Sequence, residues 1–90
     1  MNYTPEACEE RRRRIRLSVA AYAYEYENSS VMSDDEFDRL CKQVNLEQPT
    51  GDDELDAFFK KTFHPDTGMW VRSHPDKQKL SAIYRRYHNQ

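Results

Sequence analysis

The sequence predicts an all-α domain, and three observations support this prediction. The chain is 37% hydrophobic and 33% charged, with a mean hydropathy of -1.11, which is polar for a folded protein. Six Tyr, four Phe and one Trp nevertheless supply enough bulky side chains for a core. Only two Gly occur, and apolar residues recur at helical spacing in four segments. We expect residues 1–90 to form a single domain of modest stability, as is usual at this length.

The first predicted helix begins at Thr4 and runs to about Glu27. Thr4 is suited to cap it, and Pro5 stands where a missing N–H costs nothing. Apolar side chains then recur at helical spacing, at Ile15, Val19, Tyr22 and Tyr26. The following residues, "ENSS", end the helix.

Three tyrosines alternate along this helix in the stretch "AYAYEY". At about 100° per residue, Tyr22 and Tyr26 share one face and Tyr24 points nearly the opposite way. One face can belong to the core. The ring of Tyr24 then needs another explanation, which is a second packing surface, a partner or a ligand.

The second predicted helix has the clearest local signal in the chain. Ser33 and Glu36 form a capping box, and Met32 and Phe37 stand at the positions of a hydrophobic staple. One apolar stripe follows, made of Phe37, Leu40, Cys41 and Val44. The stretch "QPTG" ends this unit, so that the first two helices form a hairpin over about 15–45.

Two further helices are expected within about 52–88. The third begins near Asp52, and its inward-facing residues are Leu55, Phe58 and Phe59. The last begins at Pro75 and has an apolar stripe of Leu80, Ile83, Tyr84 and Tyr87. Between them, Pro65–Gly68 is typical of a tight turn in which Gly68 supplies a positive φ. Met69–Val71 is expected to form a short hairpin arm or an ordered loop. Such short amphipathic helices must pack on one another to be stable.

The stretch "AYAYEYENSSVMSDDEFDRLCKQV" resembles the N-terminal helical hairpin, domain Ia, of bacterial NAD-dependent DNA ligases. The match covers about 15–44, and includes the S/P-D-x-E-Y-D-x-L pattern of the second helix. The stretches "FHPDTGMWVRSHPDK" and "KLSAIYRRY" resemble the C-terminal half of small phage and prophage proteins described as ligase-related. The resemblance to the ligase hairpin is thus well defined, and the resemblance to the phage and prophage proteins is more general.

In those ligases the hairpin binds the nicotinamide mononucleotide half of NAD by aromatic stacking and carboxylates. By position, the resemblance gives the stacking role to Tyr24 and the carboxylate roles to Asp34 and Asp38. Two positions depart from the pattern. Glu25 stands where ligases usually have His, which adds negative charge beside a phosphate, and Phe37 replaces a Tyr and has no hydroxyl. We therefore predict no cofactor, with nicotinamide mononucleotide or NAD as the alternative ligand.

Catalysis finds no support in the sequence. The ligases use a lysine in a KxDG motif, which does not occur in these 90 residues. No Ser/His/Asp or Cys/His grouping and no Gly-rich phosphate loop is present. Cys8 and Cys41 lack CxxC spacing and fit apolar helix faces, so we expect buried, reduced thiols. The protein is predicted not to be an enzyme.

The tripeptide His-Pro-Asp occurs twice, at His64–Asp66 and at His74–Asp76. It is the signature of J-domain co-chaperones, but the strongly basic second helix and the tight hairpin that those need are missing. The four His and Asp side chains do not have an established zinc spacing, so no metal site is predicted. In the simplest interpretation Asp66 stabilises a turn and Pro75 begins a helix.

Exposed charged and aromatic residues are the candidates for contact with a partner. Four consecutive arginines point to every side of a helix, so they suit a solvated, salt-bridged helix, an acidic partner or phosphates. A net charge of -2 and a pI of about 5.9 count against general nucleic-acid binding. A Trp in an irregular segment anchors either its own loop or a partner. The candidate contact residues are Tyr24, Asp34, Asp38, Trp70, Arg11, Arg12, Arg14 and Arg16.

The function expected from the resemblance is that of a non-enzymatic accessory protein of phage or prophage origin. Such a protein engages a host or phage protein, in some cases as an inhibitor. A nicotinamide-nucleotide-binding module, and an accessory factor for a DNA-processing enzyme or nucleic acid, are the alternatives. No apolar stretch reaches the about 20 residues of a membrane span, and the charged N-terminus is not a signal peptide. We therefore expect a protein of the bacterial cytoplasm without a membrane partner, for which a homodimer through exposed aromatics is compatible with the sequence.

Overall fold

The computed structural model describes residues 4–88, and side chains from 4 to 86. Four α-helices and one 3-10 helix make up this part of the chain, which contains no strand. The elements are α1 (Pro5–Tyr26), α2 (Asp34–Gln43), α3 (Asp53–Thr62), η1 (Met69–Ser73) and α4 (Lys77–His88). The prediction of an all-α fold with four helices is confirmed. None of these helices combines the length and the apolar character needed to cross a membrane.

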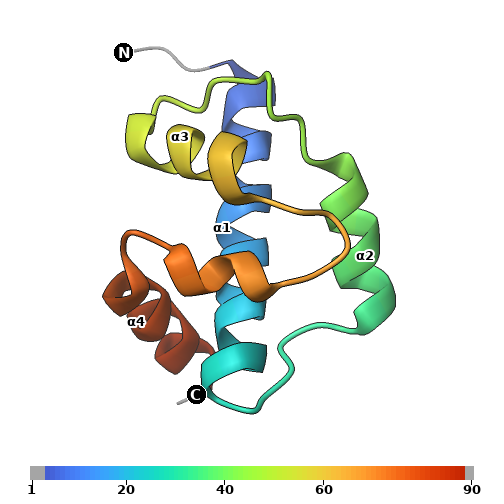
Figure 1. Ribbon diagram of the computed structural model, residues 1–90, viewed down its shortest axis with the longest axis vertical. Coiled ribbons are helices and arrows are strands. Elements are labelled where there is room, and N and C mark those ends of the chain that lie inside the picture. The colour runs from blue at the N-terminus through green and yellow to red at the C-terminus, as the bar shows by residue number, and fades with distance from the viewer. Residues whose placement is uncertain (1–3, 89–90) are drawn as a thin grey trace.

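The long helix α1 is the centre of the fold. Figure 1 shows α2 antiparallel to it on one side, with α3 and α4 on the other and η1 crossing it. Because α1 packs against α2, η1 and α4, its buried residues do not form a single stripe. Three consecutive residues, Val19, Ala20 and Ala21, are all buried. The alanines of this half of α1 let neighbouring backbones approach closely.

The helices begin where the capping residues predict. Thr4 Oγ1 accepts a hydrogen bond of 3.1 Å from the N–H of Ala7, and Ser33 Oγ accepts one of 3.1 Å from Glu36. Asp52 Oδ1 caps α3 in the same way, at 3.1 Å from the N–H of Leu55. Each bond satisfies an N–H that the first turn of a helix leaves free.

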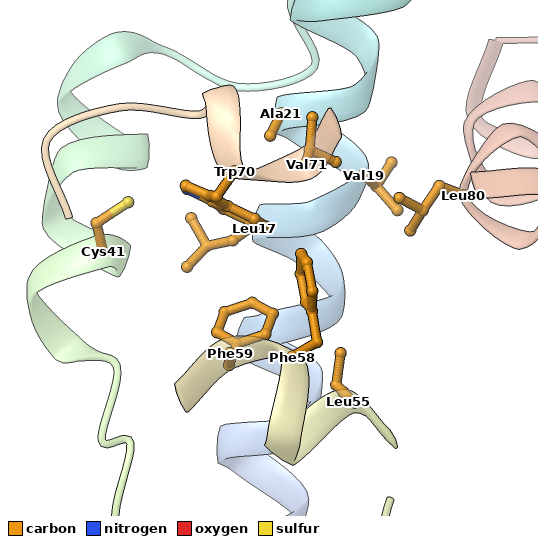
Figure 2. Close-up of a cluster of buried hydrophobic side chains, with 10 residues drawn as sticks. All are labelled: Leu17, Val19, Ala21, Cys41, Leu55, Phe58, Phe59, Trp70, Val71 and Leu80. Atoms are coloured by element: carbon orange, nitrogen blue, oxygen red, sulfur yellow. The ribbon is translucent and has the colours of Figure 1, made fainter. Parts of the chain in front are cut away.

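Aromatic rings fill the core around η1, as Figure 2 shows. Trp70 is only 4% exposed, and its ring centroid lies 5.2 Å from Phe59, 5.3 Å from Phe63 and 6.1 Å from Phe58. Cys41 of α2 and Leu80 of α4 close the same cluster from opposite sides. Trp70 therefore anchors its own segment. The expectation that it contacts a partner is wrong, because its ring has almost no accessible surface.

The segment between α3 and α4 differs from the prediction in two further respects. Met69–Ser73 is a turn of 3-10 helix, so the hairpin arm is wrong and the alternative, an ordered loop, is closer to the structure. Gly68 has φ -101°, so it does not supply a positive φ. A Cβ on Gly68 would lie 3.2 Å from Cβ of Ala21, so close approach to α1 is the reason for glycine here. It is Gly51, with φ 86°, that adopts the left-handed conformation.

The last helix begins at Lys77, two residues after the predicted start at Pro75. Asp76 Oδ1 accepts a hydrogen bond of 3.1 Å from the N–H of Lys79, which is a capping contact. Leu80 is buried, and Ile83 and Tyr84 pack against the core as expected. The side chain of Tyr87, predicted on the same stripe, lies outside the described residues.

Candidate binding groove beside Tyr24

A groove of about 390 Å³ opens beside the C-terminal half of α1. Tyr24 of α1 and Met69 of η1 line it with exposed apolar surface, since their side chains are 71% and 53% exposed. The linker between α1 and α2 adds Val31 and Met32, and Phe37 of α2 completes the apolar lining. We call this feature the Tyr24 groove. Its residues come from three separate stretches of the chain, 20–25, 30–37 and 67–72, so the fold brings them together.

Ala20 and Ala21 also line the Tyr24 groove, and both are buried. With Gly68 beside them, the wall nearest α1 consists of small residues. Small residues leave room for another molecule to come close to the helix backbone. The groove is therefore a consequence of sequence composition along "AAYAY" together with the glycine that follows the Pro65–Thr67 turn.

Three charged residues line the groove, and two of them neutralise each other. Arg72 Nη2 lies 3.5 Å from Glu25 Oε2, in an ion pair whose Glu25 side chain is largely buried. The remaining charge is the carboxylate of Asp34, which is exposed. Asp34 lies in the first turn of α2, where the helix dipole stabilises a negative charge. The lining thus has a net charge of one negative unit.

The groove brings together some of the candidate contact residues and not others. Tyr24 and Asp34 share its lining, whereas Asp38 is exposed one turn further along α2 and lies outside it. The rings of Tyr22 and Tyr26 pack against each other in a tilted arrangement on another side of α1, with their centroids 5.2 Å apart. The geometric expectation that Tyr24 points away from that pair, with an accessible ring, is confirmed.

Arg14 is the largest correction to the candidate residues. Its side chain is completely buried, and its donors are used within the fold. Nε lies 2.8 Å from Glu10 Oε2, and Nη1 lies 2.8 Å from Asp56 Oδ1. Nη2 donates to the carbonyl oxygens of Asn45 and Gln48, at 2.7 and 3.0 Å. Arg14 is therefore a structural residue and has no surface for a partner.

The same network fixes the connection between α2 and α3. Glu10, which is 1% exposed, accepts hydrogen bonds from Arg13 and Arg14 and from the N–H of Asn45. Asp56 accepts from the N–H of Thr50 at 3.0 Å and from its hydroxyl at 2.5 Å. We call this the Arg14 network. It ties residues 45–50, which have no helix of their own, to α1 and α3.

The other candidate arginines, Arg11, Arg12 and Arg16, are exposed, and none of them lines the Tyr24 groove. Arg16 Nη2 is 3.6 Å from Glu36 Oε2, so this arginine is in a surface ion pair. Within the described part of the chain, Arg11 and Arg12 are exposed and take part in no ion pair. Arg12 and Tyr24 are 12 positions apart on one helix, which is about 18 Å along its axis. The predicted contact residues therefore belong to two separate surfaces.

The two His-Pro-Asp tripeptides form the same local turn. In each, the histidine Nδ1 accepts a hydrogen bond from the aspartate N–H two residues later, at 3.2 Å from Asp66 and 3.0 Å from Asp76. His64 is exposed, whereas His74 is buried edge-on against Phe58, at 5.0 Å between ring centroids. Burial lowers the pKa of His74, against a smaller opposing effect of Asp76. The repeat is thus a turn motif of the fold.

The two cysteines are both free, but they differ in exposure. Cys8 is exposed, so the expectation that it is buried is wrong. Cys41 is buried, and burial together with Asp38 and Asp66 raises its pKa to about 11. A thiol in such surroundings is chemically inert. Within the described residues, no three His, Cys, Asp or Glu side chains form a group that could hold a metal ion.

Among the groove residues outside the list of candidate contact residues are Met69, which the sequence singles out only together with Trp70, and Arg72. The signal that points to Met69 is the run Met-Trp-Val in a segment without periodicity, because three consecutive bulky residues of a tight helix cannot all face inward. Trp70 and Val71 are buried and Met69 is left outside. Arg72 has no such signal, since its partner Glu25 is 47 positions away and meets it only through tertiary structure.

Comparisons of the chain with protein-family models, with curated proteins and with solved structures find no match.

Proposed function

We propose that the chain is a non-enzymatic accessory protein of phage or prophage origin, which engages a host or phage protein through the Tyr24 groove. The observation that supports this function is the exposed ring of Tyr24 at the edge of an apolar groove. A tyrosine that is 71% exposed contributes little to folding, and aromatic residues are enriched where partners bind. Binding at the groove is also a means to inhibit the partner.

Other features of the groove support a protein partner. Met32 and Met69 both line it, and flexible thioether side chains adapt to apolar partners of different shapes. The groove combines an apolar centre with a polar edge formed by Asp34, Glu25 and Arg72. This is the usual arrangement of a protein-binding site.

The test is capture of a partner by the full chain from a bacterial lysate, followed by calorimetry with the purified partner. Tyr24→Ala removes the groove ring, and Tyr26→Ala is its matched control, an exposed tyrosine two positions away on another face. We expect Tyr26→Ala to bind like the original chain and Tyr24→Ala to lose at least tenfold in affinity. Equal binding by the two variants, or no captured protein, contradicts the proposal.

A second candidate function is the binding of a nicotinamide nucleotide. Two features favour it: Tyr24 and Asp34 line one groove, and 390 Å³ falls within the size range of small-molecule sites. Arg72, the cation beside them, is paired with Glu25, so a phosphate would have to compete for it. Asp38, the second carboxylate implied by the ligase resemblance, lies outside the lining. Calorimetry with NAD and with nicotinamide mononucleotide tests this function, and the absence of heat at millimolar ligand excludes it.

A further inference from the structure

We infer that the Tyr24 groove takes a basic segment of a partner protein, one that places an apolar side chain against Tyr24 and Met69 and a lysine or arginine beside Asp34 and Asp38. The inference rests on the proposed function and specifies its partner. Three observations support it, and they concern the charge balance of the groove, the acids beside it and the positions of the cations.

The first observation is that, among the described residues, the one cation that lines the groove is already paired. Arg72 lies 3.5 Å from Glu25, so an acidic partner would have to compete with that carboxylate. Asp34 also lines the groove and is exposed, and the described structure gives it neither an ion pair nor a hydrogen bond through its side chain. A cation of a partner can therefore pair with the free carboxylate of Asp34. An anion finds no unpaired cation among the described lining residues.

The second observation is that two further carboxylates, Asp38 and Asp66, lie outside the lining but close to the same part of α2. Asp38 follows Asp34 by one turn of α2, and Asp66 belongs to the connection between α3 and η1. Both raise the pKa of the Cys41 thiol that lies between these two elements, so both act on one small region. All three aspartates are exposed. Potentials add over such a group, and a basic segment gains more from three neighbouring carboxylates than from one.

The third observation is the separation of charge along α1. The unpaired cations Arg11 and Arg12 lie near its N-terminal end, about 18 Å from Tyr24 along the helix. A Debye length of about 8 Å at physiological ionic strength screens them from the groove. These two cations of α1 therefore do not offset the negative charge of the groove lining.

The apolar part of the partner follows from the lining itself. Tyr24, Met69 and Met32 offer exposed or half-exposed apolar surface, and Ala20 and Ala21 leave space beneath. A leucine or phenylalanine side chain fits such a site and supplies most of the affinity. The flanking basic residues then supply selectivity, because an acidic segment with the same anchor is repelled.

The experiment uses the full chain labelled with ¹⁵N and three synthetic peptides that share a Leu-Phe anchor and differ only in flanking lysine, glutamine or glutamate. We expect the lysine peptide to shift amide signals of residues 20–25, 31–37 and 67–72, and to bind at least tenfold more tightly than the glutamate peptide. The double variant Asp34→Asn/Asp38→Asn weakens the lysine peptide about fivefold, the effect of two exposed ion pairs, and leaves the glutamine peptide unchanged. The matched control Asp53→Asn/Glu54→Gln removes the same charge from exposed positions of α3 and leaves all three affinities unchanged.

Several results would overturn the inference. One is equal binding of the three peptides with dependence on Tyr24 alone, which leaves the proposed function standing. Another is the absence of binding by any peptide at millimolar concentration. A third is a peptide that instead shifts the amide signals of residues around another hollow, of about 360 Å³, which lies on the other side of the linker near Val19 and Ile83. Shifts of the groove amides that depend on protein concentration without peptide identify a second copy as the occupant, and also overturn it. The proposed function fails separately, when partner capture does not depend on Tyr24.

Discussion

Polar side chains of the two halves of α1 have opposite environments: Glu10 and Arg14 are buried and paired, and Tyr24 is exposed. In the N-terminal half, Glu10 and Arg14 are buried and every acceptor and donor meets a partner in the Arg14 network. In the C-terminal half, Tyr24 faces an open groove, whose lining it shares with Asp34 of α2. Residue type does not distinguish the halves, since both contain charges and bulky side chains. Burial and pairing decide which residues hold the fold and which are available to a partner.

The energetic consequences of this difference are large. A buried ion pair gives little net stability, but removal of one partner leaves a charge in the interior and is strongly unfavourable. An exposed side chain with few neighbours contributes almost nothing. The buried and paired residues of the N-terminal half of α1 should therefore be sensitive to single substitutions, and the exposed residues of the Tyr24 groove should tolerate them. Four substitution tests follow from this contrast.

The largest effect is expected for Arg14→Met. The substitution keeps an unbranched apolar side chain over the ring of Phe59. It removes one of the three donors to the buried Glu10 carboxylate, and takes the Arg14 charge away from Asp56 and two carbonyl oxygens. We expect the free energy of unfolding to fall by about 3–5 kcal/mol. Urea unfolding followed by circular dichroism measures it. Arg11→Met, at an exposed position of the same arginine run, should change it by less than about 0.5 kcal/mol. A loss below about 1 kcal/mol for Arg14→Met would mean that the network does not hold the fold.

Glu10→Gln tests the other side of the network and should have a smaller effect. Glutamine keeps one oxygen as acceptor but turns an NH₂ group toward the donors of Arg13 or Arg14. Arg14 keeps Asp56 as a counter-charge, so its buried charge is not left alone. We expect a loss of about 2 kcal/mol, the cost of an unsatisfied charged hydrogen bond. Glu9→Gln, one position away and exposed, is the control; a similar loss there would refute a specific role of Glu10.

The sequence predicts the helices well because their signals are local. Thr4, Ser33 and Asp52 each cap a helix within a few residues of the predicted start, and the stripes of α2, α3 and α4 face the core as their spacing indicates. The exposure of Tyr24 is also local information, since it follows from the rotation of one helix. These features need no knowledge of distant residues.

The burial of Arg14 and of Trp70 could not be predicted in the same way. In the sequence Arg14 is one of four identical neighbours, and what distinguishes it are partners 31 to 42 positions away. Trp70 lies in a segment without periodicity, and it is packing against Phe59 and Phe63 that turns it inward. The groove depends likewise on the meeting of α1, α2 and η1. Contacts of this kind join residues that are far apart in the chain, so they produce no periodic pattern in the sequence.

Acid should weaken the fold through His74, to a smaller extent than either network substitution. Burial lowers the pKa of His74 below its usual value of 6.5, so the unfolded chain binds a proton in a pH range where the folded chain does not. Stability is therefore highest above pH 6.5, falls as the pH drops below 6.5, and stops falling through this group below the folded pKa. Protonation at Nδ1 also removes the acceptor for the Asp76 N–H.

His74→Asn isolates this effect, because an asparagine oxygen can accept the same hydrogen bond without titrating. Urea unfolding between pH 7.5 and 5 should show a steeper decline for the original chain than for this variant. His64→Asn changes the same tripeptide at an exposed position and is the control. Identical slopes for the original chain and His74→Asn would show that His74 does not contribute to acid sensitivity.

The smallest effect on stability is expected in the groove. Tyr24→Ala removes a ring that is 71% exposed, and Ala is the better helix former, so the two contributions offset each other. Asp34→Asn weakens a favourable interaction with the dipole of α2 by a few tenths of a kcal/mol. We expect both variants to unfold within about 0.5 kcal/mol of the original chain, by the urea experiment used for Arg14. A loss above about 1.5 kcal/mol in either would place that residue among those that hold the fold. The exposed ring would then be explained by folding, and the contrast between the two halves of α1 would disappear.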